Sequence, residues 1–229
     1  MVAGHGEPGL AAIDNLYRSL SVGRPDVARE DLPHVAPRSL EAADQRSLLR
    51  AVQRCPSARD RAIATVFLYT ALRLSELGAL DVGDVSMSAR RGRLTVRVGK
   101  GDTYREVPLN SACRAALQEW LTARTAQLSG PHGAQGGRGD GQALWLARSG
   151  ARLSIRAIDL VVRRLAADAG LAVSAQLLRH TCVTNLVRAG TDVVLVAELA
   201  GHRRLDTTRR YSLPSEADRD AAVEALLQP

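Results

Sequence analysis

The stretch SARDRAIATVFLYTALRLSEL, residues 57–77, joins a largely apolar run to an arginine, Arg73. The apolar residues before Arg73 cover every side of a helix, a pattern typical of a helix at the centre of a domain. An arginine that follows such a helix can project from the core towards a groove, or it can pair with Glu76 or Asp81. We therefore predict a central buried helix, with Ser75 as the cap of the next short helix.

Helical patterns of apolar residues flank this central helix on both sides. Ser39 and Asn110 are placed to cap two of the helices, and Gly190 and Gly201 to end two others. The predicted helices span residues 39–52, 110–128, 154–169, 175–189 and 192–200, with a short turn at 206–211 and a tail helix from Ser215.

A small sheet is predicted between these helices. RLTVRV (93–98) and YREVPL (104–109) alternate apolar and polar residues around a GKGD turn, as in a β-hairpin at the edge of an antiparallel sheet. ALWLA (143–147) predicts a further strand after a glycine-rich loop at 129–142. The predicted fold class is α+β and mainly α: a helical bundle with a small antiparallel β-sheet on one side.

The amino-terminal segment is predicted to lie outside this domain. Residues 9–22 carry apolar residues at helical spacing, and a charged segment rich in proline follows at 24–38. One helix before a linker cannot form a domain by itself. Residues 1–37 are therefore interpreted as the last helix of another domain plus a linker, and residues 38–229 as one compact domain with a carboxy-terminal tail helix.

Composition narrows the possible functions. The 229-residue chain has a formal net charge of +7 and a pI near 10.1, which favours an anionic partner such as nucleic acid. Aromatic residues make up only 3%, which argues against stacking on single-stranded bases. Cys55, Cys113 and Cys182 lie far apart and are interpreted as reduced core residues rather than disulfide or zinc ligands. Since no apolar run reaches membrane-spanning length, we expect a cytoplasmic protein with no membrane partner.

Lys100 is the only lysine among the 31 Lys and Arg residues, and it lies at the predicted hairpin tip. Arginine keeps its proton at any working pH, whereas lysine can both bind a phosphate and donate a proton. The alternative is an ordinary surface lysine in a turn.

Arginine and histidine recur in the last third of the chain. Arg179 and His180 lie beside the inward face of the helix predicted at 175–189, where a charge is costly unless it is paired or functional. His180 is interpreted as a core histidine. His202 comes directly after a helix-ending glycine, where the imidazole can point into a cleft, and Tyr211 follows nine residues later.

Four motifs, TALRLSEL, VGKGDTYREVPL, LLRHTCVTNLVRAG and LAGHRRLDTTRRYS, resemble in order and spacing those of the tyrosine recombinases, also called phage integrases. The resemblance covers about residues 38–215. It implies the catalytic domain of a site-specific DNA recombinase, which wraps double-stranded DNA and forms a transient 3′-phosphotyrosine without metal, ATP or another cofactor. It also implies a homotetramer on paired DNA sites, with exchange of carboxy-terminal tails, and no small-molecule substrate.

The resemblance assigns a role to each motif residue. Arg73 and Arg179 would bind the non-bridging oxygens of the phosphate in bidentate geometry, and His202 would donate a further hydrogen bond to the same group. Lys100 would protonate the departing 5′ oxygen. Tyr211 would be the nucleophile.

Gln176 occupies the position where this family usually has a histidine, three residues before the second arginine. Its amide can hydrogen-bond a phosphate, so we expect a DNA contact, but it cannot take up a proton at neutral pH. A catalytically impaired, truncated integrase relative that acts as a DNA-binding protein is therefore one alternative. A type IB topoisomerase-like enzyme that relaxes DNA is another.

Overall fold

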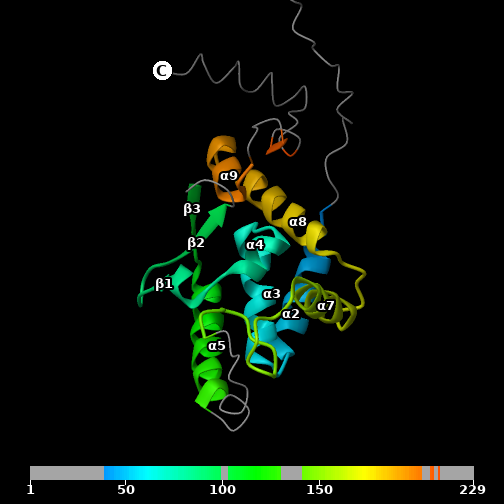
Figure 1. Cartoon of the computed structure of the whole chain (residues 1–229). Coiled ribbons are helices and arrows are strands. Elements are labelled where there is room, and N and C mark those ends of the chain that lie inside the picture. Colours follow the sequence, from blue (N-terminus) through cyan, green and yellow to red (C-terminus); the bar gives the residue numbers. More distant parts are fainter. Residues whose placement is uncertain (1–38, 99–102, 130–140, 203–206, 209–210, 212–229) are drawn as a thin grey trace, which may run out of the picture. The chain divides into compact units, whose positions relative to one another are not determined.

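The computed structural model describes residues 39–98, 103–129, 141–202, 207–208 and 211, all within a compact unit at Val35–Pro229 (Figure 1). The helix predicted at 9–22, the linker after it, the hairpin tip with Lys100 and the tail helix from Ser215 lie outside the described residues. None of the described helices is long and apolar enough to cross a membrane.

The buried central helix is confirmed as α3 (Ala58–Thr70). Its start is capped by the side chain of Ser57, which accepts a hydrogen bond from the backbone N–H of Asp60. Ile63 and Phe67 are almost fully buried because α3 packs against helices on several sides (Figure 1). These neighbours are α2 (Ala42–Arg54), α5 (Ser111–Ser129), α7 (Ile155–Ala167) and α8 (Ala175–Arg188).

Three predicted helix boundaries are confirmed. Asn110 accepts a hydrogen bond from the N–H of Cys113 at the start of α5. Gly190 after α8 and Gly201 after α9 (Val193–Ala200) have φ of 77° and 64°, in the left-handed region that favours glycine.

The cap predicted at Ser39 is wrong. The backbone N–H of Leu40 donates to the hydroxyl of Thr181, 2.9 Å away, and the side chain of Leu40 is buried. The chain therefore stays extended at this point, and α2 begins only after Glu41.

The cap predicted at Ser75 is also wrong. α4 (Leu74–Ala79) begins directly after Arg73, so Ser75 lies inside the helix. The carboxylate of Glu76 accepts the backbone N–H of Arg73 at 2.8 Å. Glu76 thus satisfies the N–H group that precedes the first turn, and it also faces the pocket described below.

The predicted hairpin is confirmed as part of a three-stranded antiparallel sheet. The register pairs Leu94 with Val107 and Val96 with Arg105. Residues directly opposite each other share a face of the sheet, and the three apolar residues of these pairs are buried, so Arg105 lies on the inner face as well. The strands follow the order β1 (Val85–Met87), β2 (Gly92–Val98) and β3 (Thr103–Pro108).

The strand predicted at 143–147 is wrong. Among the described residues this segment forms isolated bridges, Ala143 with Asp81 and Leu146 with Arg152. The side chains from Ala143 to Leu146 are all fully buried. The apolar run therefore reflects burial on every side in the core rather than a place in the sheet.

The three cysteines, Cys55, Cys113 and Cys182, are buried as free thiols, in agreement with the sequence prediction.

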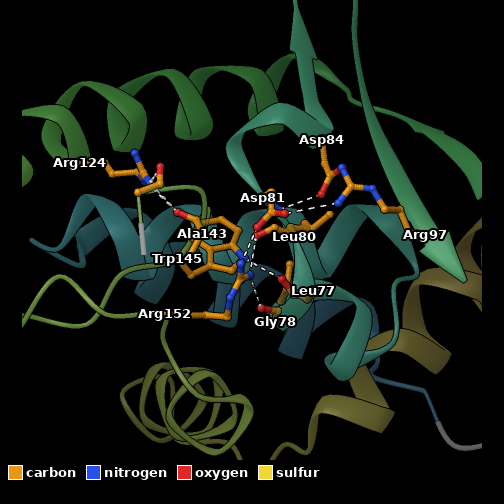
Figure 2. A network of polar contacts seen from close by, with 11 residues as sticks. Leu77, Gly78, Leu80, Asp81, Asp84, Arg97, Arg124, Ala143, Trp145 and Arg152 are labelled. Carbon is orange, nitrogen blue, oxygen red and sulfur yellow. Dashed lines mark hydrogen bonds and ion pairs between the residues drawn. The ribbon is translucent and has the colours of Figure 1, made fainter. Parts of the chain in front are cut away.

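A network of polar contacts joins the sheet to the helical core (Figure 2). Asp81 accepts hydrogen bonds from Arg152 at 2.5 Å and from Arg97 of β2 at 3.3 Å. The indole N–H of Trp145 donates to the carbonyl oxygen of Leu77 in α4 at 2.8 Å. These contacts fix the carboxy-terminal half of α4, and so they also fix the direction in which its first residues project.

Replacing Trp145 with Phe should test this attachment. The lost N–H donor leaves a buried carbonyl without that bond, and the smaller ring fills less of the core. We expect the free energy of unfolding to fall by about 1–3 kcal/mol, measured by urea denaturation. Tyr104→Phe is the control, because this side chain is 68% exposed, and it should change stability by no more than about 0.5 kcal/mol. Equal stability of the Trp145→Phe protein and the parent would contradict the role of this bond.

Candidate active site

A pocket of about 590 Å³ lies between the start of α4, the helices α7 and α8, and the segment after α9. These elements are far apart in sequence and meet through the packing of α8 on α3 and α9. His180, interpreted from sequence as a core residue, lines the pocket instead. The lining also contains five of the six site residues singled out from the sequence: Arg73, Gln176, Arg179, His202 and Tyr211. The sixth, Lys100, lies outside the described residues, and its place in the site stays a prediction.

Arg73 both pairs with a carboxylate and faces the pocket. Its Nη1 donates to Oε1 of Glu76 at 2.8 Å, and its Nη2 donates to the carbonyl oxygen of Gly201 at 2.7 Å. The side chain is still 43% exposed. Both interpretations from the sequence, pairing with Glu76 and projection towards a groove, therefore hold for Arg73. One edge of its guanidinium is held by Glu76 and Gly201, and the rest is open to a ligand.

Arg105, on β3, also contacts Glu76. Its Nη1 and Nη2 donate to Oε1 and Oε2 of Glu76 at 3.0 and 2.7 Å, and its Nε donates to the carbonyl oxygen of Leu199 at 3.0 Å. Burial by itself would raise the pKa of Glu76, but the guanidinium groups of Arg105 and Arg73 outweigh it and lower that pKa to about 2. Glu76 therefore stays ionised and connects α4 with β3 at any ordinary pH.

Arg179 is the most enclosed of the pocket's cations. Its Nη1 donates to the carbonyl oxygen of Ala71, which has a φ of 50°, and its Nη2 donates to that of Ala200 at 2.8 Å. Both acceptors are neutral, so they position the guanidinium without cancelling its charge. Burial, and then the positive charge of Arg73, lower the pKa of Arg179 to about 10. The group is thus still charged at pH 7, in a site that favours an incoming anion.

His202 leaves the end of α9 through the left-handed turn at Gly201. Its Nδ1 lies 2.7 Å from the hydroxyl oxygen of Thr208, a fully buried residue. Burial first, and then the positive charges of Arg179 and Arg73, lower the pKa of His202 to about 4. The imidazole is therefore neutral at pH 7 and keeps one N–H as a donor.

Tyr211 contacts His180 directly. The Tyr211 hydroxyl and the Nδ1 of His180 share a hydrogen bond, and the two ring centroids are 5.7 Å apart. The backbone N–H of Tyr211 donates to the carbonyl oxygen of Thr208 at 2.9 Å. Burial first, and then the charge of Arg179, lower the pKa of His180. One buried threonine thus contacts His202 with its hydroxyl and supports the Tyr211 turn with its carbonyl.

Three further residues shape this site. Arg105 and Thr208 had no predicted role, and His180 was predicted to be a core residue. The alternation of β3 was a usable signal for Arg105, because an arginine on the apolar face of a strand needs a buried partner. The sequence carried no comparable signal for the contact between His180 and Tyr211, whose positions are 31 residues apart.

The sequence model of the phage integrase family matches residues 38–217. The chain belongs to this family. The match takes in α2 through Tyr211, and so it contains every described residue that lines the pocket. The resemblance drawn from the four motifs is confirmed.

Two curated relatives show the extent of the similarity. A tyrosine recombinase XerC of Haemophilus ducreyi is 34% identical over 197 residues, which cover 85% of this chain and 59% of that protein. A tyrosine recombinase XerC of Chromohalobacter salexigens is 38% identical over 156 residues, which cover 67% of this chain and 48% of that protein. The integrase-family chain thus spans about half the length of these relatives.

Solved structures of recombinases have the same fold. The XerH site-specific recombinase bound to difH substrate, in a pre-cleavage complex, has a TM-score of 0.69 at 25% identity, covering 82% of this chain and 54% of that chain. The XerA recombinase has a TM-score of 0.65 at 24% identity, and the match covers 96% of this chain and 74% of that chain. The predicted fold class, mainly α with a small antiparallel sheet, is confirmed.

Glu76→Gln should reveal how much the shared carboxylate stabilises the domain. A carboxylate whose pKa is lowered by folding stabilises the folded state above its ordinary pKa, and this contribution is lost as the pH falls towards the lowered value. We expect the free energy of unfolding to be about 2–3 kcal/mol lower than in the parent at pH 7. The difference should shrink between the ordinary pKa of 4.5 and the folded value of about 2.

Glu106→Gln is the matched control for this experiment. Glu106 pairs with Arg93 at 2.6 Å, but the two side chains are 46% and 51% exposed. An exposed pair contributes about 0–1 kcal/mol. If both variants lost the same stability, or if the Glu76→Gln difference did not depend on pH, the carboxylate would not have the role described.

Proposed function

We propose that this chain is the catalytic domain of a site-specific DNA recombinase that cuts and rejoins duplex DNA through a 3′-phosphotyrosine. The observation that carries the proposal is the meeting of Tyr211 with Arg73, Arg179 and His202 around one pocket. A tyrosine hydroxyl beside two arginines is suited to attack on a phosphodiester, because the guanidinium groups bind the anion that the tyrosine attacks.

The arginines supply the charge that this reaction needs. Arg73 and Arg105 both contact the carboxylate of Glu76, and Arg179 interacts electrostatically with the same carboxylate, so three guanidinium groups share one negative charge and the cluster stays positive. Attack on the phosphate gives a phosphorane-like state with more negative charge on its non-bridging oxygens than the substrate has. Arg73 and Arg179, which line the pocket, would stabilise that state more than the ground state.

His202 would add a neutral hydrogen-bond donor. When the Thr208 hydroxyl donates to Nδ1, the remaining hydrogen is on Nε2, and this N–H is available to a phosphate oxygen. Because the lowered pKa keeps the ring uncharged at pH 7, it donates without adding a further positive charge to the arginines. Phosphate binding would bring the negative charge that this cluster otherwise lacks.

The proposed reaction has two balanced steps. Tyr211 Oη gives its proton to a base and forms a bond to phosphorus as the bond from phosphorus to the 5′ oxygen breaks, and Lys100 protonates that oxygen. In the second step a 5′ hydroxyl attacks the phosphotyrosine and gives its proton back to Lys100, and the released Tyr211 oxygen takes its own proton back from the base. The energy of the broken phosphodiester bond is kept in the phosphotyrosine bond, so the proposed reaction needs no metal, ATP or other cofactor.

Double-stranded DNA is the proposed partner. The net charge of +7 supports it, and so does the similarity to XerH, whose structure contains a difH substrate. We propose a homotetramer on paired sites in the cytoplasm, with exchange of carboxy-terminal tails, and Gln176 as a DNA contact. Strand exchange is favoured over topoisomerase-like relaxation because the curated relatives are recombinases.

Tyr211→Phe tests the nucleophile. The variant lacks only the attacking oxygen, so it should bind DNA as the parent does and form no covalent adduct. The assay uses a duplex site selected from random sequence by binding to this chain, nicked so that cleavage cannot reverse, with the adduct read on a denaturing gel. Tyr104→Phe, at an exposed position on β3, is the control and should form adduct normally. A parent protein that binds the site and makes no adduct would instead support the DNA-binding alternative.

Lys100→Arg separates phosphate binding from proton donation. Arginine keeps the charge but gives up no usable proton, so DNA affinity should change little while adduct formation slows by about 10²-fold or more. A substrate with sulfur in place of the 5′ leaving oxygen needs less protonation and should restore the rate. If the sulfur substrate did not restore the rate of the Lys100→Arg protein, Lys100 would only bind phosphate and would not donate the proton.

A further inference from the structure

The phenolic proton of Tyr211 needs an acceptor in this site. A free tyrosine has a pKa near 10, so at neutral pH nearly every Tyr211 hydroxyl is protonated when it attacks. Gln176 stands where the family usually has a histidine, and an amide cannot take up that proton. Its side chain is exposed at the pocket wall, one helical turn before His180.

A different side chain, that of His180, contacts the tyrosine oxygen in the structure. Nδ1 of His180 is in hydrogen-bond contact with the Tyr211 hydroxyl. We propose that His180 is a catalytic residue: its Nδ1 takes the phenolic proton as Tyr211 Oη bonds to phosphorus, and returns it when the phosphotyrosine is resolved. This inference rests on the proposed function, and it adds the base to a reaction whose leaving oxygen is protonated separately by Lys100.

Packing holds the two rings in this arrangement. Tyr211 packs against a small apolar cluster between α8 and α9 that is separate from the main core. His180 lies on the α8 face that lines the pocket, next to Arg179, whose two carbonyl bonds fix that turn of the helix. The tyrosine therefore meets the imidazole before DNA binds. The buried members of the cluster are Ala71, Cys182, Val183, Val196 and Ala200.

The charges around His180 favour a neutral imidazole that can act as a base. Burial and Arg179 both disfavour the imidazolium in the free protein, which lowers the pKa of His180. With the ring hydrogen on Nε2, Nδ1 is an acceptor for the hydroxyl. As the phosphate gains negative charge in the reaction, the imidazolium that forms is stabilised. The other titratable groups that line the pocket are Arg73, Asp159, Arg163, His202 and Tyr211.

His180→Gln is the decisive variant, because an amide still bonds the hydroxyl and cannot accept its proton. In single-turnover adduct formation with the full chain on the nicked duplex, the rate should fall by about 10²-fold or more with unchanged DNA affinity. The residual rate should climb from pH 7 to 9 as hydroxide replaces the base, whereas the parent rate should be nearly level there. Adding Gln176→His to the His180→Gln protein should raise the rate of adduct formation again by at least about 10-fold, because it places an imidazole one helical turn from position 180.

The outcomes separate this inference from the proposed function. If His180→Gln forms adduct as fast as the parent while Tyr211→Phe forms none, the proposed function stands and the role of His180 is overturned. If the parent forms no adduct, both fail. Should His180→Gln not fold by circular dichroism, the pH profile of the parent decides. A rate that is level from pH 7 to 9 and falls in acid supports the base, and a rate proportional to hydroxide throughout overturns it.

Discussion

Two arginines share the carboxylate of Glu76, and the geometry of the pocket depends on that contact. Arg73 reaches it from the start of α4 and Arg105 from β3, and each then donates to a carbonyl in the last turn of α9 or just after it. One ionised group thus holds together a helix start, a strand and a helix end. Without a negative charge between them, guanidinium groups this close would repel each other and the three elements would separate.

Most of the fold follows from short-range signals in the sequence. The cap at Asn110 and the alternation at 93–98 act within a few residues, and both predictions were correct. Ser39 failed as a cap because a hydrogen bond between Leu40 and Thr181, 141 residues away, keeps the chain extended. In the site, the motif residues were found from the family pattern. The alternation along 104–109 could have shown that Arg105 points inward, but its partner Glu76 and the contact of His180 with Tyr211 depend on the packing of elements far apart in the sequence, which no local pattern encodes.

The charge of the site is divided between two kinds of side chain. The arginines are positively charged at pH 7, and burial first, with these charges after it, lowers the pKa values of His180 and His202. Each imidazole is then neutral in the free protein, and its partner determines what it can do. With its ring hydrogen on Nε2, His180 can accept from the Tyr211 hydroxyl, and His202 in the same tautomer accepts from the Thr208 hydroxyl and keeps an N–H to donate. The two histidines are thereby suited to different tasks within one electrostatic field.

The glycine at the end of α9 has a consequence for how this chain can evolve. A Cβ atom at Gly201 would lie 2.5 Å from Nη1 of Arg105 and 2.7 Å from its Cζ, in a backbone conformation that other residues rarely adopt. Even a methyl group would therefore require the guanidinium of Arg105 to shift from its present position beside Glu76. An inherited change at a residue with no side chain would then alter the surroundings of a charged one, and the glycine and the arginine pair are subject to a common constraint.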